Sequence, residues 1–309
     1  MFPMILVIIL LLILIITLIV FRIAFYSSPR GRVENIYDIP SGEQYQSQRE
    51  RMRALITSYA AVPCEHVSIH SHDGLKLHAR YMHFCDGAPL ELQFHGYRGS
   101  AIRDFCGGSE SARSGGRNIL LVDQRANGAS EGSVISFGIN ERLDVLSWVN
   151  YAVSRFGPDT KIILVGVSMG AATVLMSTDL PLPANVRGII ADCPYSSPEA
   201  IIRKVCRDMH LPAPLMMPFI RLAARMFGKF DLSAASPVDS VRSAKVPILV
   251  VHGEDDRFVP CDMSREIHAA NPAMVRLLTV PDAGHGLSYI VDTDGYNAAV
   301  SDFVGSLNL

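Results

Sequence analysis

Two serines of this chain lie between glycines in the pattern Gly-x-Ser-x-Gly, at Ser130 and Ser168. Such a serine can act as a nucleophile where the pattern forms a sharp turn from a strand into a helix, because the turn pushes the hydroxyl out of the backbone. The apolar run 161–165 precedes Ser168 and the helix-forming run 171–176 follows it. Ser130 follows a polar loop and leads into no helix start. The sequence therefore predicts Ser168 as the nucleophile and Ser130 as a loop serine.

A serine hydroxyl needs a base that removes its proton, and a histidine base needs an acid that holds it in the right tautomer. His285 lies in a glycine-flanked loop after the last predicted strand. Loops at the carboxyl ends of parallel strands are where such a sheet presents its chemistry, so we predict His285 as the base. The loop after the preceding strand offers three adjacent acids, and spacing does not choose among Glu254, Asp255 and Asp256.

Attack by a serine on a carbonyl group creates an oxyanion, which needs fixed N–H donors. One donor is expected from the residue after the nucleophile, the backbone N–H of Met169. A second should come from a turn after an early strand, and the run 90–99 contains such a turn at His95-Gly96-Tyr97. The glycines there allow close approach of the backbone. We therefore predict the backbone N–H of Tyr97 as the second donor.

The elements that must position these residues follow from Glu65 onward, where short apolar runs alternate with stretches of helical period. This alternation predicts a mostly parallel sheet with helices on both faces, and runs rich in Val, Ile and Leu suit strands covered on both sides. The predicted strands are 67–70, 75–83, 90–94, 119–122, 161–165, 186–191, 246–251 and 275–280, and the predicted helices are 140–155, 169–178 and 297–307.

One long stretch between two predicted strands contains no strand candidate. We interpret residues 194–244 as a mostly helical insertion, a cap over one end of the sheet. Its apolar run 215–220 could line a pocket for an apolar part of a substrate or could pack the cap on the body. Flexible methionines are compatible with both alternatives.

The N-terminus begins with 18 apolar or nearly apolar residues, Met4–Phe21, which as a helix would span about 27 Å. A cleaved signal peptide would have a basic start and a small-residue exit, and neither is present. We predict an uncleaved transmembrane helix over 4–21 and a lipid bilayer as partner. Arg22, Arg30 and Arg32 follow it, so the positive-inside bias places the body in the cytoplasm. Residues 22–64 are interpreted as a tether and a polar helix over 43–60.

Composition narrows the remaining function classes. The net charge of −2 argues against a nucleic-acid partner. No two of the six cysteines are closer than 13 residues, which excludes a CxxC metal or redox motif. Five histidines (66, 70, 72, 78 and 83) lie in or beside the first predicted hairpin, and a metal cluster there, with His70 and His72 on one strand face, is the weaker alternative. We expect no metal and no organic cofactor.

The order of Ser168, acid and His285, with His95-Gly-Tyr before them, resembles the α/β-hydrolase superfamily, in particular its branch of serine aminopeptidases and monoacylglycerol lipases. The resemblance covers roughly residues 65–307, and we take residues 65–309 as the hydrolase domain. The segment His252-Gly-x-x-Asp256-x-x-Val-Pro is similar to the acid loop of that branch, and this similarity selects Asp256 as the acid.

A second matching segment begins at Asp123 and is similar to the Asp-x-Arg-Gly-x-Gly-x-Ser loop of the branch, which accounts for the pattern at Ser130. It departs from the family at Ala126, where glycine is usual. The resemblance implies a serine hydrolase of small acyl substrates. The N-terminal run adds a membrane anchor, and esters are favoured because the cap run is apolar and the anchor keeps the site near lipid. A peptidase or an acyltransferase on the same three residues remains an alternative, and a non-catalytic binding protein is the alternative from another class.

Overall fold

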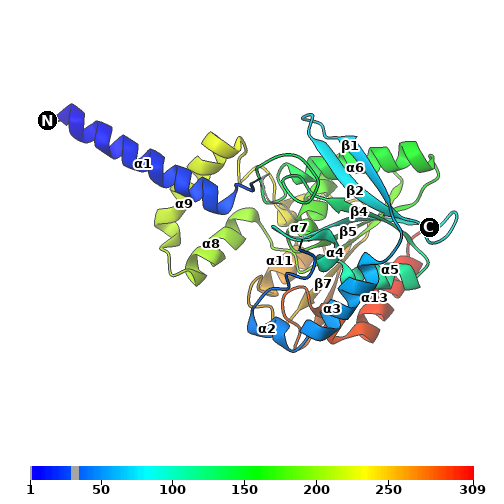
Figure 1. The fold of residues 1–309 in the computed structure, drawn as a ribbon. Helices are drawn as coiled ribbons and strands as arrows, with labels where there is room; N and C mark the ends of the chain where they lie inside the picture. The colour runs from blue at the N-terminus through cyan, green and yellow to red at the C-terminus, as the bar shows by residue number, and fades with distance from the viewer. Residues whose placement is uncertain (1, 29–34) are drawn as a thin grey trace.

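The core of the molecule is an eight-stranded sheet (Figure 1). In a computed structural model, which describes residues 2–28 and 35–309, the strand order is β1-β2-β4-β3-β5-β6-β7-β8. β1 pairs antiparallel with β2, and β2 pairs antiparallel with β4, whereas the pairs from β4 to β8 are parallel. The strands are β1 (Glu65–His70), β2 (Lys76–Met82), β3 (Leu90–Phe94), β4 (Asn118–Asp123), β5 (Ile162–Val167), β6 (Val186–Asp192), β7 (Ile248–Gly253) and β8 (Val275–Val280).

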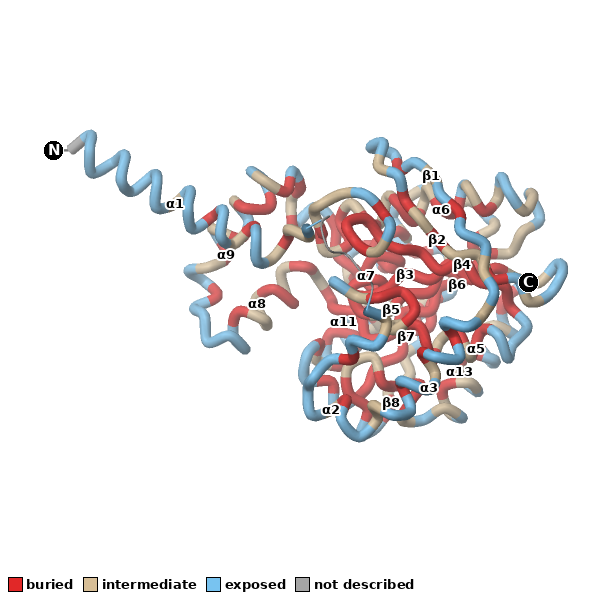
Figure 2. The backbone as a smooth tube through the Cα atoms, in the orientation of Figure 1, coloured by how far each residue is buried: buried red, intermediate tan, exposed pale blue. Residues whose placement is uncertain are grey.

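The central strands are buried on both faces because successive side chains point to opposite sides. In β4, Ile119 and Leu121 belong to one apolar cluster, while Leu120 and Val122 belong to another. Helices cover both clusters, as Figure 2 shows by the buried sheet between partly exposed helices. One cluster includes residues of α3 (Arg49–Ala60), α4 (Ala101–Asp104), α5 (Cys106–Ser114), α12 (Ser288–Val291) and α13 (Thr293–Gly305), and the other includes residues of α6 (Glu141–Phe156), α7 (Met169–Met176), α10 (Pro237–Val241) and α11 (Asp262–Ala270).

The predicted fold class is confirmed. Each of the eight predicted strands is present within a few residues of its expected bounds, and the three predicted body helices correspond to α6, α7 and α13. α13 begins earlier than expected because the side chain of Asp292 accepts a hydrogen bond from the Gly295 N–H and caps the helix. α4, α5, α11 and α12 were not predicted.

The predicted polar helix over 43–60 is broken in the structure. It forms a single turn, α2 (Glu43–Gln46), followed by α3. The break puts α2 beside the loop of His285, because the Tyr45 hydroxyl donates to the His285 carbonyl at 2.9 Å. The break therefore brings α2 to a site residue far away in the sequence.

Between β6 and β7 the chain forms the predicted helical insertion. Its elements before α10 are α8 (Pro198–Asp208), α9 (Ala213–Ala223) and the π-helical turn η2 (Ala224–Gly228). α8 and α9 lie beyond the end of the sheet (Figure 1). Met217 and Ile220 pack in a cluster with Phe21 and Phe25 of the N-terminal segment. These two residues of the apolar run 215–220 thus pack the cap, and no described residue of the run lines the pocket described below.

The N-terminal helix α1 (Phe2–Ala24) projects from the body (Figure 1). Within its residues Pro3–Ala24 an 18-residue window has a mean hydropathy of 3.7, so the helix is long and apolar enough to cross a membrane, a test that a signal sequence also passes. The start of the expected tether is packed, since Tyr26 pairs with Val134 and Ser27 donates to the Ser133 carbonyl. Arg30 and Arg32, on which the orientation prediction partly depends, lie outside the described residues.

Candidate active site

Ser168 lies at a strained turn between β5 and α7. Its φ of 56° is in the left-handed region that non-glycine residues rarely adopt. Small neighbours are required there, because a Cβ at Gly170 would overlap the carbonyl of Phe94, and a Cβ at Gly166 would overlap the backbone of residues 170 and 171. The turn is therefore built by close packing of β5, α7 and the end of β3, as the glycine pattern predicted.

His285 and Asp256 lie next to this serine. His285 Nε2 is 2.9 Å from Ser168 Oγ, and His285 Nδ1 is 2.6 Å from Asp256 Oδ2. A carboxylate can only accept, so Nδ1 carries the proton and Nε2 is free to accept from the serine hydroxyl. The three residues that the sequence analysis selected are thus connected by hydrogen bonds. Their catalytic role remains a prediction.

Asp256 differs from its two acidic neighbours in its burial and in its hydrogen bonds. Asp256 is buried, whereas Glu254 and Asp255 are exposed. Its Oδ1 accepts hydrogen bonds from the backbone N–H groups of Phe258 and Val259 at 2.9 and 2.8 Å. Burial alone would raise its pKa, but His285 and His252 hold the pKa of this carboxyl well below its usual range. An ionised acid is therefore fixed at Nδ1 of His285.

The turn at residues 95–97 is held from both sides. His95 Nε2 accepts from the Gln124 N–H at 3.1 Å, so its Nδ1 is the protonated nitrogen and donates to the Gly96 carbonyl at 2.8 Å. The N–H of Gly96 donates to Asp104 Oδ2 at 2.9 Å. A Cβ at Gly96 would lie 3.4 Å from Ser168 Cβ, so the turn closely approaches the serine.

The predicted oxyanion donors are placed in this region. Tyr97 follows Gly96 in the turn, and Met169 is the first residue of α7. Within the described ranges 2–28 and 35–309, no hydrogen-bond acceptor is found for either backbone N–H. Both groups are thus available, and their role as an oxyanion hole remains a prediction.

A cavity of about 430 Å³ opens at Ser168 and His285. Most of its wall is aromatic or aliphatic, and no residue of the 194–244 insertion contributes to the wall that the structure describes. The apolar lining residues include Tyr45, Met52, Phe105, Phe258, Tyr289, Ile290 and Tyr296. The acid Asp192 also lines it, and burial raises the pKa of its carboxyl to about 7.

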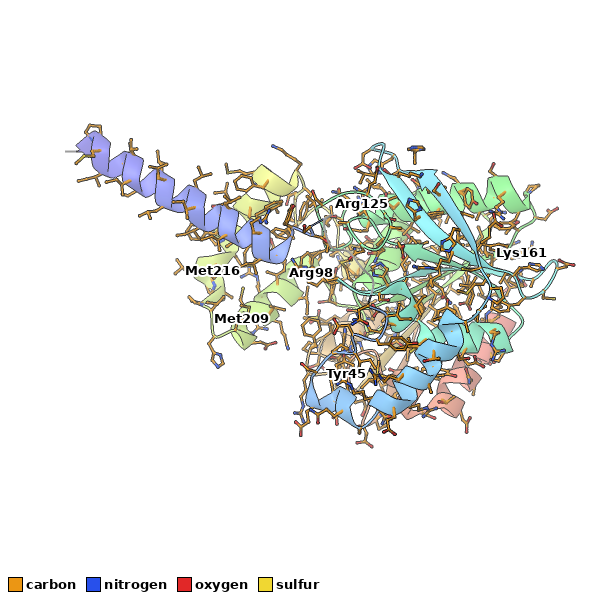
Figure 3. The ribbon with its side chains drawn as sticks, in the orientation of Figure 1. Tyr45, Arg98, Arg125, Lys161, Met209 and Met216 are labelled. Carbon is orange, nitrogen blue, oxygen red and sulfur yellow. The ribbon has the colours of Figure 1, made fainter. Side chains whose placement is uncertain are left out.

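Sequence reasoning missed several residues at this site. Tyr45 and Gln44 of α2 bind the backbone of His285, through its carbonyl at 2.9 Å and its N–H at 3.3 Å. Tyr45 is labelled in Figure 3, below the sheet. These residues lie in a polar segment without a motif, so no sequence signal pointed to them. Asp104, which holds Gly96, was missed for the same reason.

Two groups of side chains could ligate a metal by distance, and both have other partners. Cys193, Asp256 and His285 form one group, in which Asp256 and His285 are hydrogen-bonded to each other as described above. The second joins His72 to Asp73 and Asp144, and these two carboxylates bind Arg125. His72 is the one histidine of the first hairpin that joins such a group in the described part of the chain.

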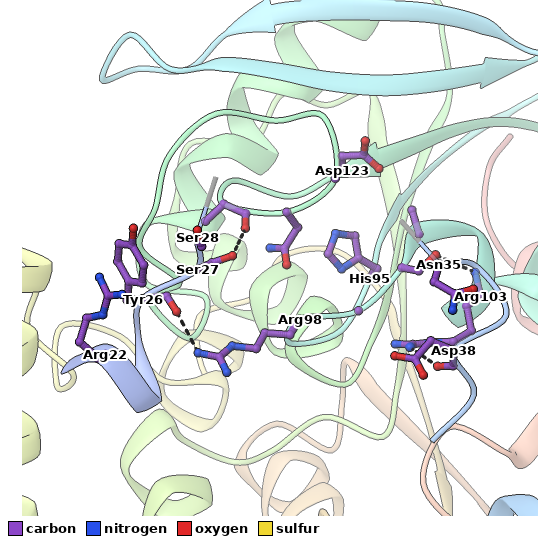
Figure 4. A pocket seen from close by; sticks show the side chains of 16 residues that line it. Arg22, Tyr26, Ser27, Ser28, Asn35, Asp38, His95, Arg98, Arg103 and Asp123 are labelled. Atoms are coloured by element: carbon purple, nitrogen blue, oxygen red, sulfur yellow. Dashed lines mark hydrogen bonds between the residues drawn. The ribbon is translucent and has the colours of Figure 1, made fainter. Parts of the chain in front are cut away.

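A second cavity, of about 500 Å³, lies on the other side of the 95–99 turn (Figure 4). It is lined by Arg22 and Tyr26 from the end of α1 and by Arg98, Arg103 and Asp123 from the body. The Arg98 guanidinium donates to the Tyr26 carbonyl at 2.9 Å across it. This cavity therefore lies between the end of α1 and the turn that approaches Ser168, and the hydrogen bond of Arg98 joins its two sides.

Two curated proteins are similar to part of this chain. The chain is 24% identical over 194 residues to the uncharacterized protein YqkD of Bacillus subtilis, covering 62% of this chain and 64% of that protein. It is 29% identical over 179 residues to the esterase LipQ of Mycobacterium tuberculosis, covering 52% and 41%. The chain thus spans less than two thirds of the length of these curated relatives.

Solved structures show the same fold. The Pyrococcus furiosus esterase Pf2001 superposes with a TM-score of 0.64 at 22% identity, covering 82% of this chain and 93% of that one. Est1E from Butyrivibrio proteoclasticus, bound to ferulic acid, superposes with a TM-score of 0.59 at 20% identity, covering 78% and 100%. Residues 94–299 match the profile of the alpha/beta hydrolase family, which includes Ser168, Asp256 and His285. The chain belongs to the alpha/beta hydrolase family.

Proposed function

We propose that this protein is a serine hydrolase that cleaves carboxylic esters through an acyl-enzyme. The observation that supports this most directly is the hydrogen-bonded series of Ser168 Oγ, His285 and Asp256, with distances of 2.9 and 2.6 Å. Both distances are within the reach needed for proton transfer. An ionised Asp256 would hold the imidazole in place and stabilise the imidazolium that forms.

The reaction would proceed in two halves. Ser168 Oγ attacks the ester carbonyl while His285 Nε2 takes its proton, and the imidazolium then returns the proton to the leaving alcohol as the C–O bond breaks. A water molecule, deprotonated by the same nitrogen, attacks the acyl-enzyme and releases the acid and the free serine. The backbone N–H groups of Tyr97 and Met169 would bind the oxyanion in both halves, and one such donor is typically worth ~10²–10³ in rate.

The apolar lining of the cavity favours esters over peptides as substrates. Its aromatic and aliphatic wall suits an acyl chain or an aromatic acyl group, and the relatives LipQ and Pf2001 carry the name esterase. A peptidase would use the same three residues, and an acyltransferase would replace the water by an alcohol. A substrate panel of esters, amides and acceptor alcohols distinguishes these alternatives by the product formed.

We further propose that α1 anchors the protein in a lipid bilayer over residues 4–21, with the body in the cytoplasm. The division into a connecting segment 22–64 and a hydrolase domain 65–309 with a cap at 194–244 belongs to this proposal. The high hydropathy and the exposure of the first half of α1 support it. Protease added to intact cells should leave the body uncut, and rapid digestion would reverse the assigned orientation.

The proposed activity is tested by Ser168→Ala, assayed with p-nitrophenyl esters of increasing acyl length. We expect hydrolysis and labelling by a fluorophosphonate to be lost, because both require the serine oxygen. Ser58→Ala, on the exposed face of α3, is the matched control. Turnover by Ser168→Ala equal to wild type would disprove the assignment. A correctly folded wild type that neither labels nor turns over would favour a non-catalytic binding protein.

A further inference from the structure

α1 is exposed along its first half and packed along its second. Residues Met4–Leu12 are exposed on all sides, as the pale tube in Figure 2 shows. From Ile13 onward a stripe is covered, with Thr17 and Phe21 buried and Val20 and Ala24 partly buried. The spacing of these residues is that of one helix face. Only the second half of α1 is therefore attached to the rest of the molecule.

The partner of this stripe is the cap. α9 packs against α1, and its residues Met217, Ile220 and Ala223 share an apolar cluster with Phe21. The ring of Phe21 lies 5.5 Å from that of Phe227 in η2. α1 and α9 lie side by side in Figure 1. The contact joins the N-terminal helix to the cap as one packed unit.

The part of α1 that does not pack on the cap, which we call the free part, is short compared with the thickness of a bilayer. Residues 2–12 span roughly 17 Å as a helix, whereas the hydrocarbon core of a bilayer is about 30 Å thick. The free part thus reaches through about half of the core. For the whole of α1 to lie in hydrocarbon, α9 must enter the same layer beside it.

The outer surface of α9 is suited to that position. Leu215 is 63% exposed and Met209, just before α9, is 57% exposed. Met209 and Met216 lie on the cap, away from the sheet (Figure 3). No described residue covers the exposed part of this surface, which consists of Met209, Leu211, Pro212, Pro214, Leu215 and Pro218. We call these six residues the cap apolar surface.

The positive net charge of the insertion also favours a lipid bilayer as the partner of this surface. Residues 194–244 contain seven Lys and Arg residues and four Asp and Glu residues, whereas the whole chain has a net charge of −2. Arg207 and His210 lie beside the cap apolar surface and are exposed. Basic residues next to an apolar surface are attracted to anionic lipid headgroups. The excess of positive charge thus lies in the insertion to which α9 belongs.

We propose that the cap apolar surface inserts into the bilayer leaflet that surrounds the second half of α1, so that the protein contacts lipid through two elements rather than one. This inference depends on the proposed anchoring through α1. The cap would lie at the membrane surface, and the orientation of the hydrolase body would be fixed by α1 and α9 together.

The experiment uses the full chain in vesicles of phosphatidylcholine and phosphatidylglycerol. Cys64 and Cys85, the two cysteines that are not buried, are replaced by serine. An environment-sensitive fluorophore is then attached in Leu215→Cys on α9 and in Leu10→Cys on the free part of α1. Ala298→Cys on exposed α13 is the control. Quenching by nitroxide lipids reports contact with the acyl chains, and fluorophosphonate labelling checks that each variant is folded.

We expect severalfold quenching at positions 10 and 215 and none at 298. Quenching at 10 without quenching at 215 would overturn the inference and leave the anchoring intact. No quenching at either position would overturn both. A shielded fluorophore at 215 that nitroxide lipids do not quench would indicate a second copy of the chain on this surface, and quenching at 298 as well would indicate adsorption of the whole body. Either result would also overturn the inference.

Discussion

The position of Ser168 depends on the two glycines that flank it. At Gly170 a methyl group would overlap the Phe94 carbonyl, and this backbone atom cannot move without shifting the turn that presents Tyr97. We predict that Gly170→Ala lowers the free energy of unfolding by about 1–3 kcal/mol and lowers kcat/KM at least tenfold, because overpacking displaces the backbone. Chemical denaturation and ester hydrolysis measure the two effects.

Gly305 provides the matched control for this substitution. It lies at the end of α13, and a Cβ there meets no atom within 4 Å. Gly305→Ala should leave both stability and activity close to wild type. Equal behaviour of the two variants would show that the close packing at Gly170 is not what holds the turn.

The buried carboxyl of Asp192 leads us to predict that the free energy of unfolding depends on pH. Its Oδ1 has no hydrogen-bond partner among the described residues, and burial, with a contribution from Asp256, raises the pKa of its carboxyl to about 7. The unfolded chain releases this proton near pH 4. Between these values the folded state binds more protons, so the free energy of unfolding falls as the pH rises.

Asp192→Asn removes the ionisation and keeps the shape. We expect wild type to lose on the order of 2 kcal/mol relative to the variant between pH 5 and pH 8. Urea unfolding at the two pH values measures this difference. If the difference in free energy of unfolding between wild type and Asp192→Asn did not change with pH, Asp192 would not be neutral in the folded state at pH 5.

At the scale of elements, the sequence predicted those helices and strands whose apolar residues recur in a regular pattern. Strands such as β3 and β8 were predicted at their observed bounds because each is a short and largely apolar segment between turns. α5 was missed because its sequence, CGGSESARS, has no apolar periodicity and packs through small residues. The site residues on strand ends were predictable, because the ends of parallel strands meet at one edge.

The residues that support His285 could not be predicted. Tyr45 is separated from it by 240 residues, and its position depends on the break between α2 and α3. Such a contact is decided by packing and leaves no local pattern. The same is true of the packing of α1 on α9, since the apolar run of α1 is hydrophobic all round and does not reveal which face is covered.

The contact of α2 with the His285 loop leads to a prediction. Tyr45→Phe removes the hydrogen bond to the His285 carbonyl, and a bond of this kind contributes about 0.5–1.5 kcal/mol. We expect kcat to fall severalfold, with a smaller change in KM, because the histidine is less well positioned for proton transfer. Steady-state kinetics over a pH series measures both.

Tyr37→Phe is the control for Tyr45→Phe. The Tyr37 hydroxyl is exposed and contacts Thr57, away from His285. It should change neither kcat nor the pH profile. A fall in stability of Tyr45→Phe with kcat unchanged would show that Tyr45 supports the fold without positioning the histidine.

At the scale of the whole molecule, the end of α1 is connected to the turn beside Ser168. The Tyr97 hydroxyl donates to the Ala24 carbonyl at 2.8 Å, and the Arg98 guanidinium donates to the Ile23 and Tyr26 carbonyls at 2.9 Å. The Ile23 and Ala24 carbonyls lie at the C-terminus of α1, where carbonyls lack partners within the helix. The residue that supplies the proposed oxyanion donor thus also caps the N-terminal helix.

A second connection runs through aromatic rings. Phe25, fully buried at the end of α1, lies 5.2 Å from Phe230 of the cap and 5.8 Å from Phe137. The Phe137 ring lies 5.2 Å from that of Tyr97. α1, the cap and the 95–98 turn therefore form one packed assembly, and a displacement of α1 should be felt at the turn.

This assembly predicts that hydrogen bonds to α1 influence catalysis. The double variant Tyr97→Phe/Arg98→Ala keeps the backbone N–H of residue 97 but removes three hydrogen bonds to the end of α1. We expect kcat and the rate of fluorophosphonate labelling to fall about tenfold, because the proposed donor is less well fixed. Arg113→Ala, which removes an exposed ion pair with Glu110, should change neither rate. A hydrogen-bond donor contributes to catalysis only when it is held in place before the charge develops. If the double variant kept wild-type rates while protease cut more readily at residues 23–28, these hydrogen bonds would hold α1 without ordering the turn.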